Sequence, residues 1–228
     1  MQGAAGMWSQ PVAYLQALSE ICQRNRVPLV LDEVATGFGR TGKMFACEHA
    51  AVTPDILCLA KGITGGYLPL AATLTTEEIF SVFLGEYREF KTFFHGHTYT
   101  GNPLGCAVAL ASLELFERDR IIEQMQPKGA YLRRRLNDEF LQLAHVSDVR
   151  QWGFMIGIEM VEDKNSRKSY APEKRIGHKV ILQARKRGVI VRPLGDVIVL
   201  MPPLTMADAE LKMLLDVVYD SIRAVTES

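Results

Sequence analysis

Two apolar runs decide the fold, Val27-Pro28-Leu29-Val30-Leu31-Asp32 and Ile56-Leu57-Cys58-Leu59-Ala60-Lys61. Each has the length of a strand and ends on one ionisable residue. Strands that are buried on both faces of a parallel sheet show such continuous apolar runs. We therefore expect two parallel strands that place Asp32 and Lys61 at the carboxyl edge of the sheet, where ligands of open α/β sheets bind.

Helices alternate with strands around these two runs. Helices are expected over residues 10–25, 44–51 and 76–84, and a third strand over residues 70–74. Ser9 can cap the first helix and Pro11 suits its first turn, while Thr75 and Glu78 have the spacing of a capping box. This alternation predicts an α/β fold with a mostly parallel, helix-covered sheet.

The pattern changes near residue 120, after a polar and aromatic loop over 85–101 and a helix that starts at Asn102-Pro103. A helical stretch over 121–143 is expected to break at Pro127, because proline lacks the N–H that a helix interior needs. Strands are expected at 149–161, 189–193 and 197–201, with a helix over 173–187 closed by Gly188 and a last helix opening at 205–208. We predict two domains, residues 1–120 and an α+β domain over 121–228.

Composition sets limits on the partners of the chain. Lys plus Arg and Asp plus Glu both number 26 in 228 residues, so the net charge is zero and gives no support for a nucleic-acid or acidic-membrane partner. The cysteines have no CxxC spacing, and no apolar stretch could span a bilayer, so we expect a reduced, cytoplasmic protein. Met1–Gly6 lacks the pattern of a signal peptide. The chain is expected to begin in the middle of a longer protein.

An acid and a lysine presented side by side suggest a pyridoxal phosphate (PLP) site. That cofactor needs a lysine for its Schiff base and an acid that keeps its pyridine nitrogen protonated. Lys61 follows an apolar strand and precedes glycines, which let a backbone approach a ligand closely. The alternatives are a solvated acidic turn at Asp32-Glu33 and an ordinary surface lysine at position 61.

Other motifs leave further alternatives open. Gly37–Lys43 has the Gly-x4-Gly-Lys of a phosphate-binding loop, but Met44 stands where a magnesium-binding Ser or Thr is expected. His95-Gly96-His97 could be half of a metal site, yet too few further ligands lie nearby, and we predict no metal. The loop His97–Asn102 leads into a helix N-terminus and suits an anion better. Arg192 ends an apolar run and could clamp a carboxylate or serve an ion pair.

These residues resemble the class III PLP-dependent aminotransferases of fold type I over nearly the whole chain. The motifs are Asp32-Glu33-Val34, Thr36–Gly42, Pro54-Asp55-Ile56 and Ala60-Lys61-Gly62. Gly65–Thr76 and His95–Leu104 are similar to the branch that converts 8-amino-7-oxononanoate to 7,8-diaminononanoate in biotin biosynthesis. The resemblance implies the fold, with residues 1–120 as the C-terminal part of the large PLP-binding domain.

The resemblance also implies a role for each site residue. Lys61 would be the catalytic Schiff-base lysine, Asp32 would hold the ring nitrogen and Val34 would press on the ring. Thr98, with the backbone near His97, would bind the cofactor phosphate from a neighbouring subunit of a homodimer. The substrate would lie beside Gly96, with its carboxylate on Arg192, and the amino donor would be S-adenosylmethionine or lysine.

Length is the main departure from the family, whose members are about twice as long. We therefore expect the C-terminal half of such an enzyme, which could work with a separate N-terminal half. The alternatives are another class III aminotransferase or aminomutase, a non-catalytic half that needs a partner chain, and a nucleotide-binding protein built on Gly37–Lys43.

Overall fold

The computed structural model describes residues 1–227, which form two compact units. We call Gln10–Gly39 with Lys43–Arg120 the N-terminal unit, and Met1–Ser9, Arg40–Gly42 and the residues from Ile121 onward the C-terminal unit. The predicted domains 1–120 and 121–228 stay a prediction. None of the described helices is long and apolar enough to cross a membrane.

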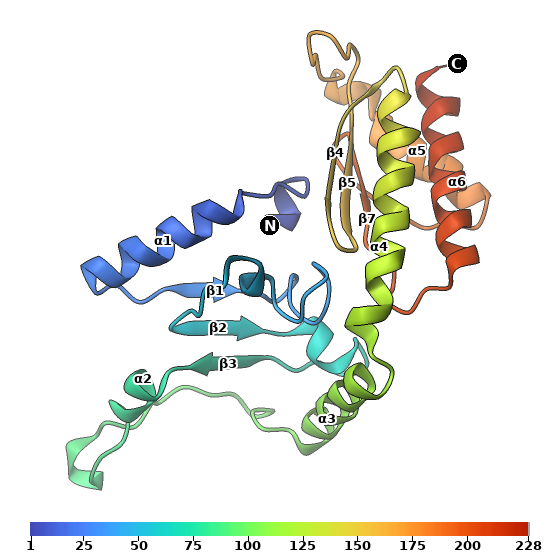
Figure 1. The fold of residues 1–228 in the computed structure, drawn as a ribbon. Coiled ribbons are helices and arrows are strands. Elements are labelled where there is room, and N and C mark those ends of the chain that lie inside the picture. Colours follow the sequence, from blue (N-terminus) through green and yellow to red (C-terminus); the bar gives the residue numbers. More distant parts are fainter. Residues whose placement is uncertain (228) are drawn as a thin grey trace. The chain divides into compact units, whose positions relative to one another are not determined.

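The N-terminal unit is built on a three-stranded sheet (Figure 1). Its elements are, in chain order, α1 (Val12–Asn25), β1 (Val30–Asp32), η2 (Ala46–Ala50), β2 (Ile56–Leu59), η3 (Lys61–Thr64), β3 (Ala72–Thr75), α2 (Glu77–Ser81), η4 (Tyr87–Glu89) and α3 (Pro103–Arg118). The first two strands are parallel, as predicted, with Asp32 opposite Cys58. Both strands therefore end at the same edge.

The third strand runs antiparallel to β2, with Cys58 opposite Thr73. The sheet therefore contains one parallel and one antiparallel pair of strands. β1 begins at Val30, later than expected, because Leu29 N–H donates to Asp55 Oδ2 at 2.7 Å instead of joining the ladder.

Two predicted caps were also wrong. α1 begins at Val12 with Pro11 in the cap position, so Ser9 does not cap it. In α2 the cap is Thr76, whose Oγ1 accepts a hydrogen bond from Ile79 N–H at 3.4 Å, and Thr75 belongs to β3. The strand therefore runs one residue further than expected before the helix can start.

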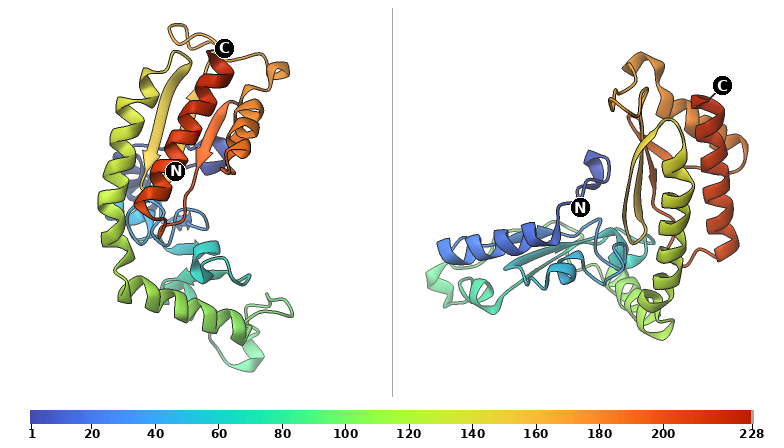
Figure 2. Two further views of the ribbon diagram at one scale, coloured as in Figure 1. Left: turned by 90° about the vertical axis from the view of Figure 1, so that its right-hand side faces the viewer. Right: turned by 45° about the horizontal axis from the view of Figure 1, so that its top comes forward.

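The C-terminal unit has an antiparallel sheet of order β4-β5-β7-β6, with helices on one face (Figures 1 and 2). Its elements are η1 (Gly3–Ala5), α4 (Ile121–Asp138), η5 (Phe140–Gln142), β4 (Val146–Trp152), β5 (Met155–Met160), η6 (Pro172–Lys174), α5 (Ile176–Lys186), β6 (Arg192–Leu194), β7 (Val197–Leu200) and α6 (Asp208–Thr226). The predicted break at Pro127 was wrong. The helix continues through Pro127, since buried Met125, Leu132 and Leu136 hold it against the core.

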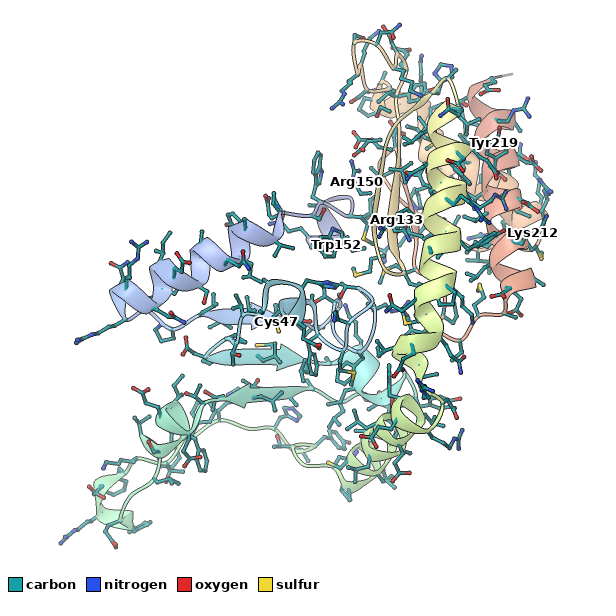
Figure 3. The ribbon with its side chains drawn as sticks, in the orientation of Figure 1. Cys47, Arg133, Arg150, Trp152, Lys212 and Tyr219 are labelled. Atoms are coloured by element: carbon teal, nitrogen blue, oxygen red, sulfur yellow. The ribbon has the colours of Figure 1, made fainter. Side chains whose placement is uncertain are left out.

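The segment Met1–Ser9 belongs to this unit and packs on its sheet. Met7 is 3% exposed and forms a core cluster with Met155 and Val199. The guanidinium of Arg150, which is labelled on β4 in Figure 3, donates to Gly6 O at 3.0 Å and lies 4.6 Å from the centre of the Trp8 ring. These contacts hold the start of the described chain on the sheet.

Candidate active site

Asp32 and Lys61 lie at the same edge of the N-terminal sheet. Asp32 ends β1, and Lys61 follows the end of the neighbouring strand β2. Asp32 is the last residue of β1 and pairs with Cys58 of β2, three residues before Lys61. The exposed Asp32 carboxylate accepts one hydrogen bond from Val34 N–H, at 2.9 Å to Oδ1. No described residue donates to Oδ2. This oxygen can therefore accept a hydrogen bond from a ligand.

The backbone of Lys61 has an uncommon conformation. Its φ is 48°, in the left-handed region, although it is neither glycine nor the end of a helix but the first residue of η3. Such a backbone costs free energy and persists where the surrounding structure imposes it, which occurs often at functional sites. The side chain is exposed, and within residues 1–227 its ammonium has no ion-pair partner. Nothing in the sequence signals this conformation.

Glu33 lies beside Asp32 in the chain but has a structural role. It is 3% exposed, and its carboxylate accepts hydrogen bonds from Ala46 N–H at 2.6 Å, Cys47 N–H at 2.7 Å and the Thr36 hydroxyl at 3.2 Å. Burial and the Glu33 carboxylate raise the pKa of the Cys47 thiol to about 12, so it stays protonated. Glu33 thus anchors the start of η2, and its carboxylate is occupied by bonds within the protein.

The glycine-rich loop Gly37–Lys43 packs against the turn of Lys61. A Cβ on Gly62 would lie 2.7 Å from the Cβ of Phe38, which is 4% exposed. Gly37 N–H donates to Glu33 O at 2.9 Å, and Gly39 N–H donates to Met44 O at 3.3 Å. A phosphate-binding loop directs its amides to the phosphate. These two amides are bonded within the protein instead, which argues against a nucleotide site.

The loop before α3 carries the other predicted cofactor residues. Gly96, His97 and Thr98 are all exposed. His97 N–H donates to Thr100 Oγ1 at 3.0 Å, and Thr100 N–H donates back to His97 O at 2.9 Å, which closes a turn just before the helix. No group of three or more His, Cys, Asp or Glu in the described chain could hold a metal ion. The turn presents backbone and hydroxyl groups near a helix N-terminus, where an anion is favoured.

Arg192 lies in the C-terminal unit, apart from the other predicted site residues. It begins β6, opposite Val199, whereas the sequence suggested that it ends a strand. Its exposed guanidinium has no hydrogen bond or ion pair with any of residues 1–227. The structure therefore brings Asp32 and Lys61 to one sheet edge, keeps Val34 and Gly96–Thr98 in the same unit, and leaves Arg192 available for an anion.

Comparisons with known proteins identify the family of the chain. The family model for class III aminotransferases matches residues 1–222. The chain is similar to proteins named adenosylmethionine-8-amino-7-oxononanoate aminotransferase. The one from Nitratidesulfovibrio vulgaris is 59% identical over 100% of this chain and 42% of its own length. The one from Methanocaldococcus jannaschii is 48% identical over 98% and 49%.

Solved structures share the fold. The crystal structure of the Methanocaldococcus jannaschii protein has a TM-score of 0.94 at 48% identity, covering 99% of this chain and 52% of that one. An amine transaminase from an uncultivated Pseudomonas species, solved in a PLP-bound form, has a TM-score of 0.92 at 38% identity, covering 98% and 50%. The chain spans about half the length of the curated relatives it matches. Its fold is that of the fold type I transaminases, and the chain belongs to the class III aminotransferase family.

Proposed function

We propose that this chain forms the C-terminal half of a PLP-dependent aminotransferase that converts 8-amino-7-oxononanoate to 7,8-diaminononanoate in biotin biosynthesis. The observation that carries the proposal is the pair Asp32 and Lys61, which two parallel strands deliver to one sheet edge. The names of the most similar relatives support the choice of substrate.

The residues present fit the cofactor. Lys61 offers an ammonium without an ion-pair partner in the described chain, and Asp32 offers an oxygen without a donor, so the two reactive groups are not consumed by internal bonds. Thr98 and the His97 backbone would hold the phosphate, and Val34 would lie against the ring. When bound, the cofactor supplies an electron sink for the substrate carbon that loses a proton.

Each of the chain's own site residues would then have a separate role. The Asp32 carboxylate would accept a hydrogen bond from the ring nitrogen and keep it protonated. Lys61 Nζ, once an amino donor has displaced it, would act as the base that takes and returns the proton at the reacting carbon. The planar guanidinium of Arg192 would hold the carboxylate of 8-amino-7-oxononanoate, and Gly96, which lacks a side chain, would leave room beside it.

The proposal includes a homodimer in the cytoplasm. Loop 85–101 is exposed throughout, and its large apolar side chains include Tyr87, Phe90 and Phe94, with 91%, 67% and 81% of their surface exposed. Apolar patches of this kind mark surfaces that another chain covers. A neighbouring subunit is the cover we propose, and Thr98 in the same loop would then bind that subunit's cofactor.

The test combines this chain with the N-terminal half of the Nitratidesulfovibrio vulgaris relative and measures 7,8-diaminononanoate formation with S-adenosylmethionine or lysine as donor. Activity is expected with one of the two donors, and Lys61→Ala should abolish it. Arg192→Gln should raise the KM for 8-amino-7-oxononanoate about tenfold or more, since a charged hydrogen bond contributes ~1.5–3 kcal/mol, with less change for the donor.

Two other outcomes would each contradict the proposal. Transamination of other ketones with none of 8-amino-7-oxononanoate would identify another class III aminotransferase or an aminomutase. A complex that forms and binds PLP without any transamination would identify a non-catalytic half.

A further inference from the structure

Strand β6, which carries Arg192, has few bonds of its own to its sheet. It is three residues long and lies at the edge of the C-terminal sheet, where β7 is its one neighbour among the described strands. Its middle residue is Pro193, which has no N–H, so only Arg192 and Leu194 have amides that could donate to β7. With so few ladder bonds, the position of β6 also depends on contacts outside the sheet.

The turn between β6 and β7 supplies such contacts through Asp196. Its carboxylate accepts a hydrogen bond from Gly177 N–H, at 3.2 Å to Oδ1, and its backbone carbonyl accepts one from Met160 N–H at 3.0 Å. Gly177 is the second residue of α5, and Met160 is the last residue of β5. Asp196 therefore ties the turn after β6 both to the helix and to the sheet of the same unit.

Helix α5 has no side-chain cap from its own sequence. Arg175 stands at the cap position with a φ of 47°, and its side chain makes no capping hydrogen bond. The first amides of a helix have no partner within the helix, and the helix dipole favours a carboxylate beside them. Asp196, 19 residues further along the chain, takes the place of a local cap.

Gly177 allows the turn to approach the helix closely. A Cβ at this position would lie 2.1 Å from Gly195 O and 3.1 Å from the Cβ of Pro193. Glycine is unfavourable in a helix relative to alanine, but here no larger residue fits without moving the turn. The start of α5 is thus packed against Pro193, the residue next to Arg192.

We propose that Asp196 is a positioning residue for Arg192. Its cap on α5 holds the turn and β6 against the helix, which fixes the backbone from which the exposed Arg192 guanidinium extends. Close-packed segments transmit small displacements because no void absorbs them. The structural step lies within the C-terminal unit, and its consequence for the carboxylate of 8-amino-7-oxononanoate rests on the proposed function.

Hydrogen exchange of the full chain tests the structural step. Asp196→Ala should accelerate exchange of the Gly177 amide and of the Arg192 and Leu194 amides about fivefold, the ratio expected for the loss of one hydrogen bond. Asp196→Asn, whose side-chain oxygen can still accept from Gly177 N–H, should restore most of the protection.

Asp220→Ala is the matched control. Asp220 pairs with Arg187 at 2.7 Å, just after the last residue of α5, so this variant removes an acidic contact at the other end of the same helix. Exchange at residues 177, 192 and 194 should stay as in the native chain. Equal acceleration in the two variants would overturn the proposal, and so would unchanged exchange at 192 and 194 in Asp196→Ala.

Steady-state kinetics of the chain combined with the N-terminal half give the second readout. Asp196→Ala should raise the KM for 8-amino-7-oxononanoate about fivefold, less than Arg192→Gln does, and should leave kcat and the KM for the donor unchanged. Asp196→Asn should keep a KM near that of the native chain. General loosening of the unit would not change one KM alone.

Two results separate the proposal from the proposed function. An unchanged KM alongside accelerated exchange in Asp196→Ala would overturn the role toward Arg192. A native complex that does not transaminate 8-amino-7-oxononanoate would instead contradict the proposed function, and the exchange result would still decide the structural step.

Discussion

Asp32 and Glu33 are adjacent in the chain, but their carboxylates have different surroundings. Asp32 ends β1 with an exposed carboxylate, whereas Glu33 is buried and accepts bonds from residues 13 and 14 positions further along the chain. Asp32 is the last residue of β1, whereas Glu33 begins the loop that follows, where the amides of η2 are within hydrogen-bond distance. The sequence indicated Asp32 as a ligand residue because it follows an apolar run. It could not assign Glu33, because the partners of Glu33 are backbone amides brought near only by the fold.

Glu33→Gln should destabilise the N-terminal unit by about 1–3 kcal/mol, because a neutral amide cannot accept three hydrogen bonds as a carboxylate does. Urea unfolding followed by circular dichroism measures the free energy. The control is Glu20→Gln on the exposed side of α1, expected within about 0.5 kcal/mol of the native chain. Equal midpoints for both variants would mean that Glu33 does not anchor η2.

The sequence predicts the position of Lys61 in the fold but not its backbone conformation. The apolar run Ile56–Ala60 predicts that Lys61 follows a strand, and the glycines after Lys61 predict a turn. Its left-handed backbone was not predicted, because nothing in the residues around Lys61 signals that conformation. The place of Lys61 in the fold was predictable, whereas its left-handed φ was not.

At the scale of elements, local signals failed where tertiary contacts outweighed them. Pro127 ends most helices, but α4 continues because its apolar side is buried on the C-terminal sheet. Segments with strong periodicity, such as α1 and α6, lay close to where they were expected.

The segment after β5 should respond to acid. Hydrogen bonds from Lys168 and Lys174 lower the pKa of the Glu162 carboxyl from 4.5 to about 2. A depressed pKa contributes stability that is present above pH 4.5 and is lost as the pH falls through about 2. The protection of the amides of residues 162–175, which is the exchange rate relative to the intrinsic rate at each pH, should therefore fall over that range.

Glu162→Gln should show the faster exchange already at neutral pH and lose its acid dependence, whereas Glu173→Gln, an exposed acid in the same segment, should behave as the native chain. The effect should be small, because the ion pairs are exposed. An identical pH profile in Glu162→Gln and the native chain would show that these pairs do not hold the segment.

At the scale of the whole molecule, the two units differ in how well they are covered. The C-terminal unit encloses a core that includes Leu132, Ile158 and Leu215, which are fully buried. The N-terminal unit leaves large side chains in contact with solvent, among them Val30 of β1 and Leu104 and Leu110 of α3, which are 53%, 68% and 63% exposed. Surfaces of this kind must be covered by another chain or promote association.

The isolated chain should therefore self-associate and bind PLP weakly. Analytical ultracentrifugation over a range of concentrations should show dimers or larger species, and adding the N-terminal half should replace them with one defined complex. A monodisperse monomer that binds PLP tightly and turns over substrate normally would contradict this expectation.

Reductive trapping shows which residue binds PLP, and we expect that residue to be Lys61. The chain, combined with the N-terminal half, is incubated with PLP, reduced with borohydride and digested, and the modified peptide is identified by mass spectrometry. One pyridoxyl group is expected on Lys61, absent in Lys61→Ala and unaffected in Lys43→Ala. Labelling spread over surface lysines, or retained in Lys61→Ala, would contradict it.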